Sequence, residues 1–175
     1  MINIHLDLDG VLADMHSDYE QRFGKKIHDV IPPKEFWNNI GTVDNYFYHL
    51  PKKPKAKLLF RFLRSIPNSK LSILSGIPIP RGKLSTAALD KEKWVHKYFS
   101  SSITVNTIVG GKNKYQYIAP GNICILIDDM QRNIDNWREA GGIGILHTDV
   151  YDTITQMHSV LDLETHPTHY FEDSD

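Results

Sequence analysis

The chain has 175 residues, of which 41% are hydrophobic and 23% charged, and its formal net charge is −1. This length suits one sizeable core with a small inserted subdomain, in an ordinary soluble globular protein. The near-neutral charge argues against a general attraction to nucleic acid or to an anionic membrane. Its single cysteine, Cys124, excludes a disulfide framework and a cysteine-based zinc site. The sequence has no signal peptide and no apolar stretch near the roughly 20 residues of a transmembrane helix, so we expect a cytoplasmic protein.

The first third of the chain predicts one strand followed by an insertion. Residues 2–8 alternate between apolar and polar side chains, which is typical of a strand. Residues 16–23 predict a helix that ends near Gly24. From about 25 to 54, prolines and aromatic residues replace any regular period, and a further amphipathic helix is expected over 55–65. We interpret residues 16–67 as a small, mainly helical cap subdomain inserted after the first strand.

The remainder predicts alternating strands and helices. Strands are expected at 71–74, 103–109, 123–127 and 143–146, and helices at 85–99, 133–140 and 153–161. This alternation implies right-handed crossovers and a parallel sheet. The predicted fold is therefore an α/β, doubly wound, Rossmann-like parallel sheet with helices on both faces. Residues 1–15 and 68–175 would form this core domain.

Three of the predicted strands stop abruptly at small or acidic residues, in the segments DLDGVLAD (7–14), LSG (74–76) and LIDD (126–129). The carboxyl ends of parallel strands meet at one edge of a sheet, where ligands bind. Four carboxylates would then meet there, and they cannot all stay ionised without a cation. They are Asp7, Asp9, Asp128 and Asp129. The pattern predicts a Mg²⁺-dependent site with a nucleophilic aspartate.

The spacing of Asp7 and Asp9 suits phosphoryl transfer. In an extended backbone residues i and i+2 point the same way, so both carboxylates can face one site. One can attack phosphorus while the other protonates the leaving oxygen and later activates water. Asp7, Asp128 and the backbone carbonyl of Asp9 would supply the oxygens that Mg²⁺ prefers. The alternative is a surface turn, because Asp-Gly, here Asp9-Gly10, is a common hairpin dipeptide.

Two further features would hold the phosphate. Ser75 and the amide of Gly76 can form a small anion-binding pair, although Ser-Gly is also an everyday turn. A cation should face the metal, and the loop before the fourth strand offers Lys114 or Lys112. For either lysine taken alone, an exposed residue in a polar loop is the better explanation.

Together these motifs resemble the haloacid dehalogenase superfamily of phosphatases. Its motifs correspond in order to Asp7 with Asp9, to Ser75, to Lys114, and to the acid pair that follows residue 127. The segment 7–14 resembles more particularly the 5′(3′)-deoxyribonucleotidase branch, as do KWV at 93–95, KYF at 97–99 and the proline-rich, aromatic insertion. The lysine-to-acid interval is longer than that pattern leads us to expect, so Lys112 stays an alternative to Lys114.

The resemblance implies a Mg²⁺-dependent phosphomonoesterase that hydrolyses (deoxy)nucleoside monophosphates through an aspartyl-phosphate. Asp7 would be the nucleophile and Asp9 the general acid and base. Asp129 would orient the metal's waters or Lys114 without binding the metal itself. Base specificity would come from cap aromatics on which a base could stack. The same aromatics could instead form the cap's own core. They are Phe36, Trp37, Tyr46 and Phe47.

Three alternatives remain at this stage. The site could serve another small phosphomonoester, or the ends of a polynucleotide, which a run of basic residues would favour. It could also be a non-enzymatic phospho-accepting receiver, although receivers carry the acid pair on the first strand. The expected partner is a small-molecule nucleotide, with no membrane and with nucleic acid not favoured, and a homodimer is left open. The basic run comprises Lys52, Lys53, Lys55, Lys57, Arg61 and Arg64.

Overall fold

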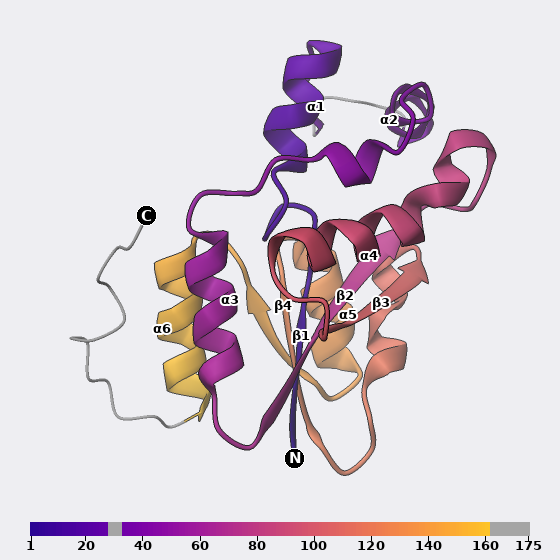
Figure 1. The fold of residues 1–175 in the computed structure, drawn as a ribbon. Helices are drawn as coiled ribbons and strands as arrows, with labels where there is room; N and C mark the ends of the chain where they lie inside the picture. The colour runs from indigo at the N-terminus through magenta and orange to yellow at the C-terminus, as the bar shows by residue number, and fades with distance from the viewer. Residues whose placement is uncertain (28–32, 162–175) are drawn as a thin grey trace.

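A parallel sheet with strand order β3-β2-β1-β4-β5 forms the centre of the computed structural model, which describes residues 1–27 and 33–161 (Figure 1). All four strand pairings are parallel. The predicted α/β, doubly wound sheet is therefore confirmed. Residues 28–32 of the predicted cap and 162–175 of the predicted core lie outside the described residues. The strands are β1 (Ile2–Leu6), β2 (Ser69–Ile77), β3 (Thr104–Val109), β4 (Ile123–Asp128) and β5 (Ile143–Leu146).

Helices cover both faces of this sheet. On one face, α3 (Ala56–Ser65), α4 (Ala87–Tyr98) and α6 (Val150–Leu161) contribute to the larger apolar cluster. On the other, α5 (Gln131–Glu139) and the 3₁₀ segment η4 (Gly111–Tyr117) close over a smaller cluster. Among the described residues, no helix has the length and apolar composition to cross a membrane.

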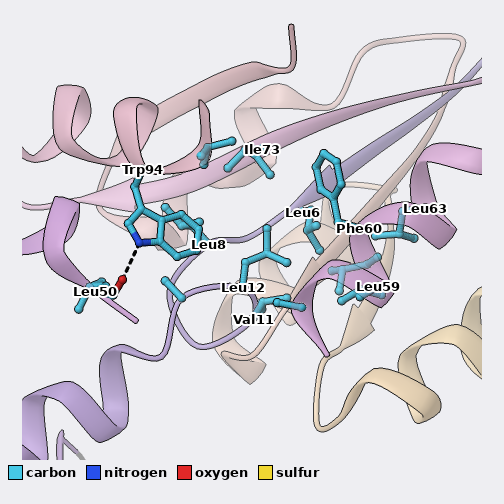
Figure 2. Packing of buried hydrophobic residues seen from close by; sticks show 14 of the residues in the cluster. Leu6, Leu8, Val11, Leu12, Leu50, Leu59, Phe60, Leu63, Ile73 and Trp94 are labelled. Atoms are coloured by element: carbon cyan, nitrogen blue, oxygen red, sulfur yellow. Dashed lines mark hydrogen bonds between the residues drawn. The ribbon is translucent and has the colours of Figure 1, made fainter. Parts of the chain in front are cut away.

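Trp94 of α4 anchors the larger cluster (Figure 2). Its side chain is fully buried, and its indole Nε1 donates a hydrogen bond of 2.7 Å to the carbonyl of Leu50. Leu59 and Leu63 of α3 and Ile73 of β2 belong to the same cluster. Each such apolar side chain contributes roughly 1.5–3 kcal/mol by leaving water. Helix α4 is thereby tied both to the sheet and to the segment that precedes α3.

The insertion after β1 stands above the carboxyl edge of the sheet in Figure 1. It contains α1 (Met15–Phe23), α2 (Pro33–Ile40) and the 3₁₀ turn η2 (Tyr46–His49). Helix α3, by contrast, packs against β2 and α6 on the face of the sheet. We therefore propose that the cap ends before Ala56, rather than at residue 67 as the sequence had led us to expect.

Strand boundaries differ from the predicted ones at the carboxyl edge. Strand β1 ends at Leu6 rather than at residue 8, because the chain turns at Leu8, whose carbonyl accepts hydrogen bonds from the amides of Leu12 and Ala13. Strand β2 runs on to Ile77 because β3 pairs with it as far as Val109. A further 3₁₀ segment, η3 (Gly82–Thr86), leads from β2 into α4.

Candidate active site

The register of the sheet brings the acidic strand ends together. Leu6 at the end of β1 pairs with Ile73 of β2 on one side and with Ile127 of β4 on the other. The next residues, Asp7 and Asp128, therefore lie beside each other, and the amide of Asp7 still donates to the carbonyl of Ile127 at 2.9 Å. The predicted meeting of these strand ends is present in the structure.

A tight loop follows Asp7 and depends on Gly10. This glycine has a φ of 81°, in the left-handed region that other residues disfavour. A Cβ on Gly10 would lie 1.8 Å from Oδ2 of Asp129. Glycine thus lets the loop turn sharply and lets the Asp129 carboxylate come close to it.

Three carboxylates at this edge could hold a metal ion. One oxygen each from Asp7, Asp128 and Asp129 lies within 4.8 Å of the other two. Asp128 is fully buried and Asp7 is 6% exposed, so water screens their charges poorly. Asp129 contributes its own oxygen to this group, whereas the sequence had suggested a place behind the ligands. A hard divalent cation is the kind of ion that an all-oxygen donor set favours.

Lys114 of η4 lies between two of these carboxylates. Its Nζ is 2.7 Å from Oδ1 of Asp7 and 2.6 Å from Oδ2 of Asp128, and the side chain is 1% exposed. Lys112 is exposed. Of the two lysines that the sequence offered, Lys114 is the one at the cluster.

A second buried lysine, Lys91 of α4, completes the cluster and was not predicted. Its ammonium contacts Oδ2 of Asp9 at 2.5 Å, Oγ of Ser75 at 2.8 Å and the carbonyl of Gly76 at 2.7 Å. A signal for it existed in the sequence. Lys91 occupies the same helical stripe as Trp94 and Val95, where an apolar residue would be expected.

Charges in the cluster do not balance. The four aspartates carry four negative charges when ionised, while Lys91 and Lys114 supply two positive ones. Burial and the neighbouring Asp7 and Asp128 raise the pKa of Asp129 to about 8, although Lys114 opposes the shift. The net deficit of two charges equals the charge of one divalent cation. The residues present therefore fit such an ion.

Burial dominates the other shifts as well. It raises the pKa of Asp9 against the opposing charge of Lys91, and that of Asp128 with Asp7 adding to the effect. Burial alone would lower the pKa of Lys114, but the carboxylates of Asp7 and Asp128 outweigh it and the net direction is upward. Lys114 is therefore favoured in its charged form, whereas burial favours the protonated forms of Asp9 and Asp128.

Helix α5 orients Asp128, a contribution that the sequence did not reveal. The amide of Met130 donates to Oδ1 of Asp128 at 2.8 Å. The Asn133 side-chain amide lies 3.1 Å and 3.0 Å from its two oxygens. An asparagine five positions after an aspartate carries no recognisable sequence signal by itself.

The predicted phosphate-binding pair lies at the end of β2 in contact with Lys91. Ser75 is fully buried. Gly76 lies against the start of η4, where an added Cβ would be 2.9 Å from the Cα of Gly111. Glycine at position 76 therefore allows the loop that carries Lys114 to approach β2.

The four cap aromatics named from the sequence pack against one another in two pairs. Phe36 contacts Trp37 and Tyr19, and Tyr46 contacts Phe47 edge to face. Tyr46 and Phe47 are each 2% exposed. These contacts are those of a small cap core. Phe47 also reaches the cluster, because the Lys91 Nζ lies 4.6 Å from its ring centroid.

Comparison with known proteins supplies the family. Residues 1–162 match the family described as 5′ nucleotidase, deoxy (pyrimidine), cytosolic type C protein (NT5C). The chain belongs to this family. It is accordingly a phosphoric monoester hydrolase of the nucleotidase type, and the receiver alternative is excluded. A search of curated proteins found no match.

A solved structure of another protein shows the same fold. A predicted HAD-like family hydrolase from Porphyromonas gingivalis superposes with a TM-score of 0.54 at 12% identity, covering 94% of this chain and 99% of that one. A HAD family enzyme from Bacteroides thetaiotaomicron, solved with magnesium and inorganic phosphate, gives a TM-score of 0.45 at 18% identity, covering 83% and 93%. The resemblance to the 5′(3′)-deoxyribonucleotidase branch that the motifs suggested is confirmed by the family match.

Proposed function

We propose that the chain is a Mg²⁺-dependent phosphatase of (deoxy)nucleoside monophosphates that works through an aspartyl-phosphate on Asp7. The observation that carries this proposal is the grouping of Asp7, Asp128 and Asp129 within 4.8 Å, with Lys114 in contact with two of them. A nucleophilic carboxylate beside a cation-binding group is the arrangement that phosphoryl transfer requires.

Asp7 and Asp9 would divide the chemistry. A carboxylate oxygen of Asp7 attacks phosphorus, and the bond from phosphorus to the ester oxygen breaks. Asp9 donates a proton to that departing oxygen, and then removes a proton from the water that hydrolyses the aspartyl-phosphate. The burial that raises the pKa of Asp9 helps it to carry the proton required in the first step.

The metal would be held by the carboxylates of Asp7 and Asp128 and by the backbone carbonyl of Asp9, with Asp129 beside them. When bound, Mg²⁺ would neutralise charge on the phosphate oxygens. Lys114 would hold a phosphoryl oxygen, and Ser75 with the Gly76 amide would complete the phosphate-binding group.

Substrate preference would come from the cap over this edge. Among the aromatics named from the sequence, Trp37 is the least enclosed, since it is only partly buried. It is the one best suited to stack on a base, an interaction worth about 1–3 kcal/mol by analogy with single-strand binders.

A polynucleotide-end phosphatase is the second candidate, and one surface observation favours it. Lys52 and Lys97 lie over the ring of Tyr98 at 5.2 and 4.9 Å, and Lys97 also lies over Tyr48 at 4.9 Å. Cations alternating with aromatic rings are typical of surfaces that contact single-stranded nucleic acid. Lys97 is six residues after Lys91 on α4, so this surface begins on the helix that reaches the site.

The test is phosphate release from a panel of deoxy- and ribonucleoside 5′- and 3′-monophosphates, with and without Mg²⁺. Selective, Mg²⁺-dependent release from deoxynucleotides is expected. A 3′-phosphorylated oligonucleotide tests the second candidate, and its preference over the mononucleotides would move the substrate there. Release from an aryl phosphate but from no nucleotide would keep the roles of Asp7 and Asp9 and reject the nucleotide.

A further inference from the structure

Lys91 differs from Lys114 in what its ammonium contacts. An ammonium group has three hydrogen atoms to donate. In Lys91 they are taken by the Asp9 carboxylate, the Ser75 hydroxyl and the Gly76 carbonyl. The side chain is 0% exposed. With all its donors engaged, Lys91 acts on the site through the groups that it holds.

The contact with Asp9 distinguishes the two oxygens of that carboxyl group. Lys91 binds Oδ2. Among the described residues, the other oxygen, Oδ1, is buried and has no hydrogen-bond partner. A free aspartate can rotate and exchange its oxygens, whereas this one is fixed. Oδ1 is therefore the oxygen left to carry a proton.

The cap covers this contact. Phe47 of η2 places its ring over the Lys91 ammonium, with 4.6 Å from Nζ to the ring centroid. Its side chain is 2% exposed, and η2 packs against α4. A cation–ring contact away from water is stabilising, and exclusion of water strengthens the neighbouring hydrogen bonds. The insertion thus supports Asp9 by way of Lys91.

We propose that Lys91 is a positioning residue that fixes Asp9 for protonation of the leaving oxygen, with Phe47 of the cap holding the lysine in place. The proposal rests on the proposed function. In the step concerned, an oxygen of Asp7 bonds to phosphorus and the bond from phosphorus to the ester oxygen breaks. The ester oxygen keeps that electron pair and takes the proton from Oδ1 of Asp9.

This role makes the effect of Lys91 depend on the leaving group. A nucleoside hydroxyl is a poor leaving group and needs the proton, whereas a nitrophenolate departs without it. Loss of Lys91 should therefore slow nucleotide cleavage far more than cleavage of 4-nitrophenyl phosphate. A lysine that served only to bind phosphate, or to hold the fold together, would affect both substrates equally.

The experiment compares kcat/KM of Lys91→Met and wild type for a deoxynucleoside 5′-monophosphate and for 4-nitrophenyl phosphate. This ratio covers only the steps up to departure of the leaving group, so hydrolysis of the aspartyl-phosphate does not enter. We expect a loss of about 100-fold with the nucleotide, the usual size of a general-acid contribution, and of less than about 5-fold with the aryl phosphate. Lys93→Met changes an exposed lysine of the same helix and should match wild type with both substrates.

A series of substituted phenyl phosphates tests the same dependence on the leaving group. The plot of log kcat/KM against the pKa of the leaving phenol should be steeper for Lys91→Met than for wild type. Equal losses with all substrates, or no loss, would overturn the proposal while leaving the proposed function intact. A wild-type protein that cleaves none of them would overturn both.

A second variant covers the case in which Lys91→Met does not fold, as judged by its melting curve. Phe47→Leu removes the ring over the ammonium but leaves Lys91 and Asp9 in place. The same selectivity is expected in weaker form, about 5- to 10-fold against the nucleotide. An equal effect on both classes of substrate would reject the proposal by this route.

Discussion

His5 lies in β1 and Asp7 follows the end of that strand, yet burial favours the neutral form of His5 while Asp7 lies in a cluster of charged groups. His5 is buried in the sheet, where Ser72 Oγ lies 3.0 Å from its Nδ1. Burial and the charge of Lys70 lower its pKa to about 4, so it is neutral at pH 7. Asp7 enters a cluster of four carboxylates and two ammonium groups.

The difference separates the part of the protein that stabilises the fold from the part that binds a ligand. The interior of the sheet is neutral, hydrogen-bonded and closely packed. The carboxyl edge keeps a net negative charge out of water, which costs stability unless a cation is bound. Such local destabilisation is expected in a binding site that is free of its ligand.

The largest expected effect is on catalysis at the charged edge. Asp7→Asn removes the nucleophile, and turnover should fall by at least about 10⁴-fold, which corresponds to roughly 5 kcal/mol of barrier. Without metal the variant should melt no lower than wild type, because repulsion with Asp128 and Asp129 is relieved. Glu139→Gln, an exposed change on α5, is the control. Retention of more than a few per cent of activity would remove Asp7 as the nucleophile.

In the interior of the core domain, removal of a side chain should lower stability rather than slow catalysis. Trp94→Ala should lower the free energy of unfolding by about 3–5 kcal/mol, because it empties a fully buried site and leaves the Leu50 carbonyl unpaired. Denaturant titration measures this loss. Leu89→Ala, on the same helix but 48% exposed, should cost less than about 0.5 kcal/mol. Similar losses for the two variants would mean that Trp94 does not anchor the core.

Mg²⁺ should offset the loss of stability that the negative charge at the carboxyl edge causes. At ten to one hundred times its dissociation constant, the ion adds about 1.4–2.7 kcal/mol to the free energy of unfolding. For a chain of this size the melting temperature should rise by about 3–10 °C. Asp128→Asn should lose most of the rise, and NaCl at equal ionic strength should not produce it. An unchanged melting curve at millimolar Mg²⁺ would argue against a shared metal site.

The effect expected to be smallest per step of the measurement is a pH dependence in the metal-free protein. The pKa of Asp129 is about 8 when folded, against the ordinary 3.8 of an unfolded aspartate. Its contribution to stability is therefore fully present below about pH 4 and is lost as the pH rises toward 8, by at most about 1.4 kcal/mol per pH unit. Thermal melts of wild type and Asp129→Asn across this range should converge at low pH. Parallel curves would show that Asp129 does not titrate there.

Much of the site could be predicted because the ends of buried strands have a recognisable sequence pattern. An apolar run that stops at Asp7, Ser75 or Asp128 indicates both a buried strand and the edge where it ends, and a parallel sheet brings such ends together. The sequence narrowed the predicted phosphate-binding lysine only to Lys112 or Lys114, because nothing in it says which face of η4 is buried.

Lys91 and the packing of α3 show where prediction from the sequence stopped. Lysine on a helix is usually solvated, so its place on the apolar stripe of Trp94 passed unnoticed. The period of α3 predicts a helix with one buried face. It does not say whether that face meets the cap or the sheet, because tertiary packing decides this.

The two ends of the insertion meet at a hydrogen-bonded neck. The amide of Asp14 donates to the carbonyl of Pro51, and the amide of Lys53 to that of Leu12, both at 2.8 Å. Chain entry and exit are thus fastened to each other next to the site, whatever lies between them. The neck already closes the loop, and the entropic cost of loop closure grows only slowly with length, so a longer insertion would lower stability little. The cap is in this sense an exchangeable module: evolution or a protein engineer could replace it to change the substrate, provided that the replacement keeps an aromatic ring over Lys91.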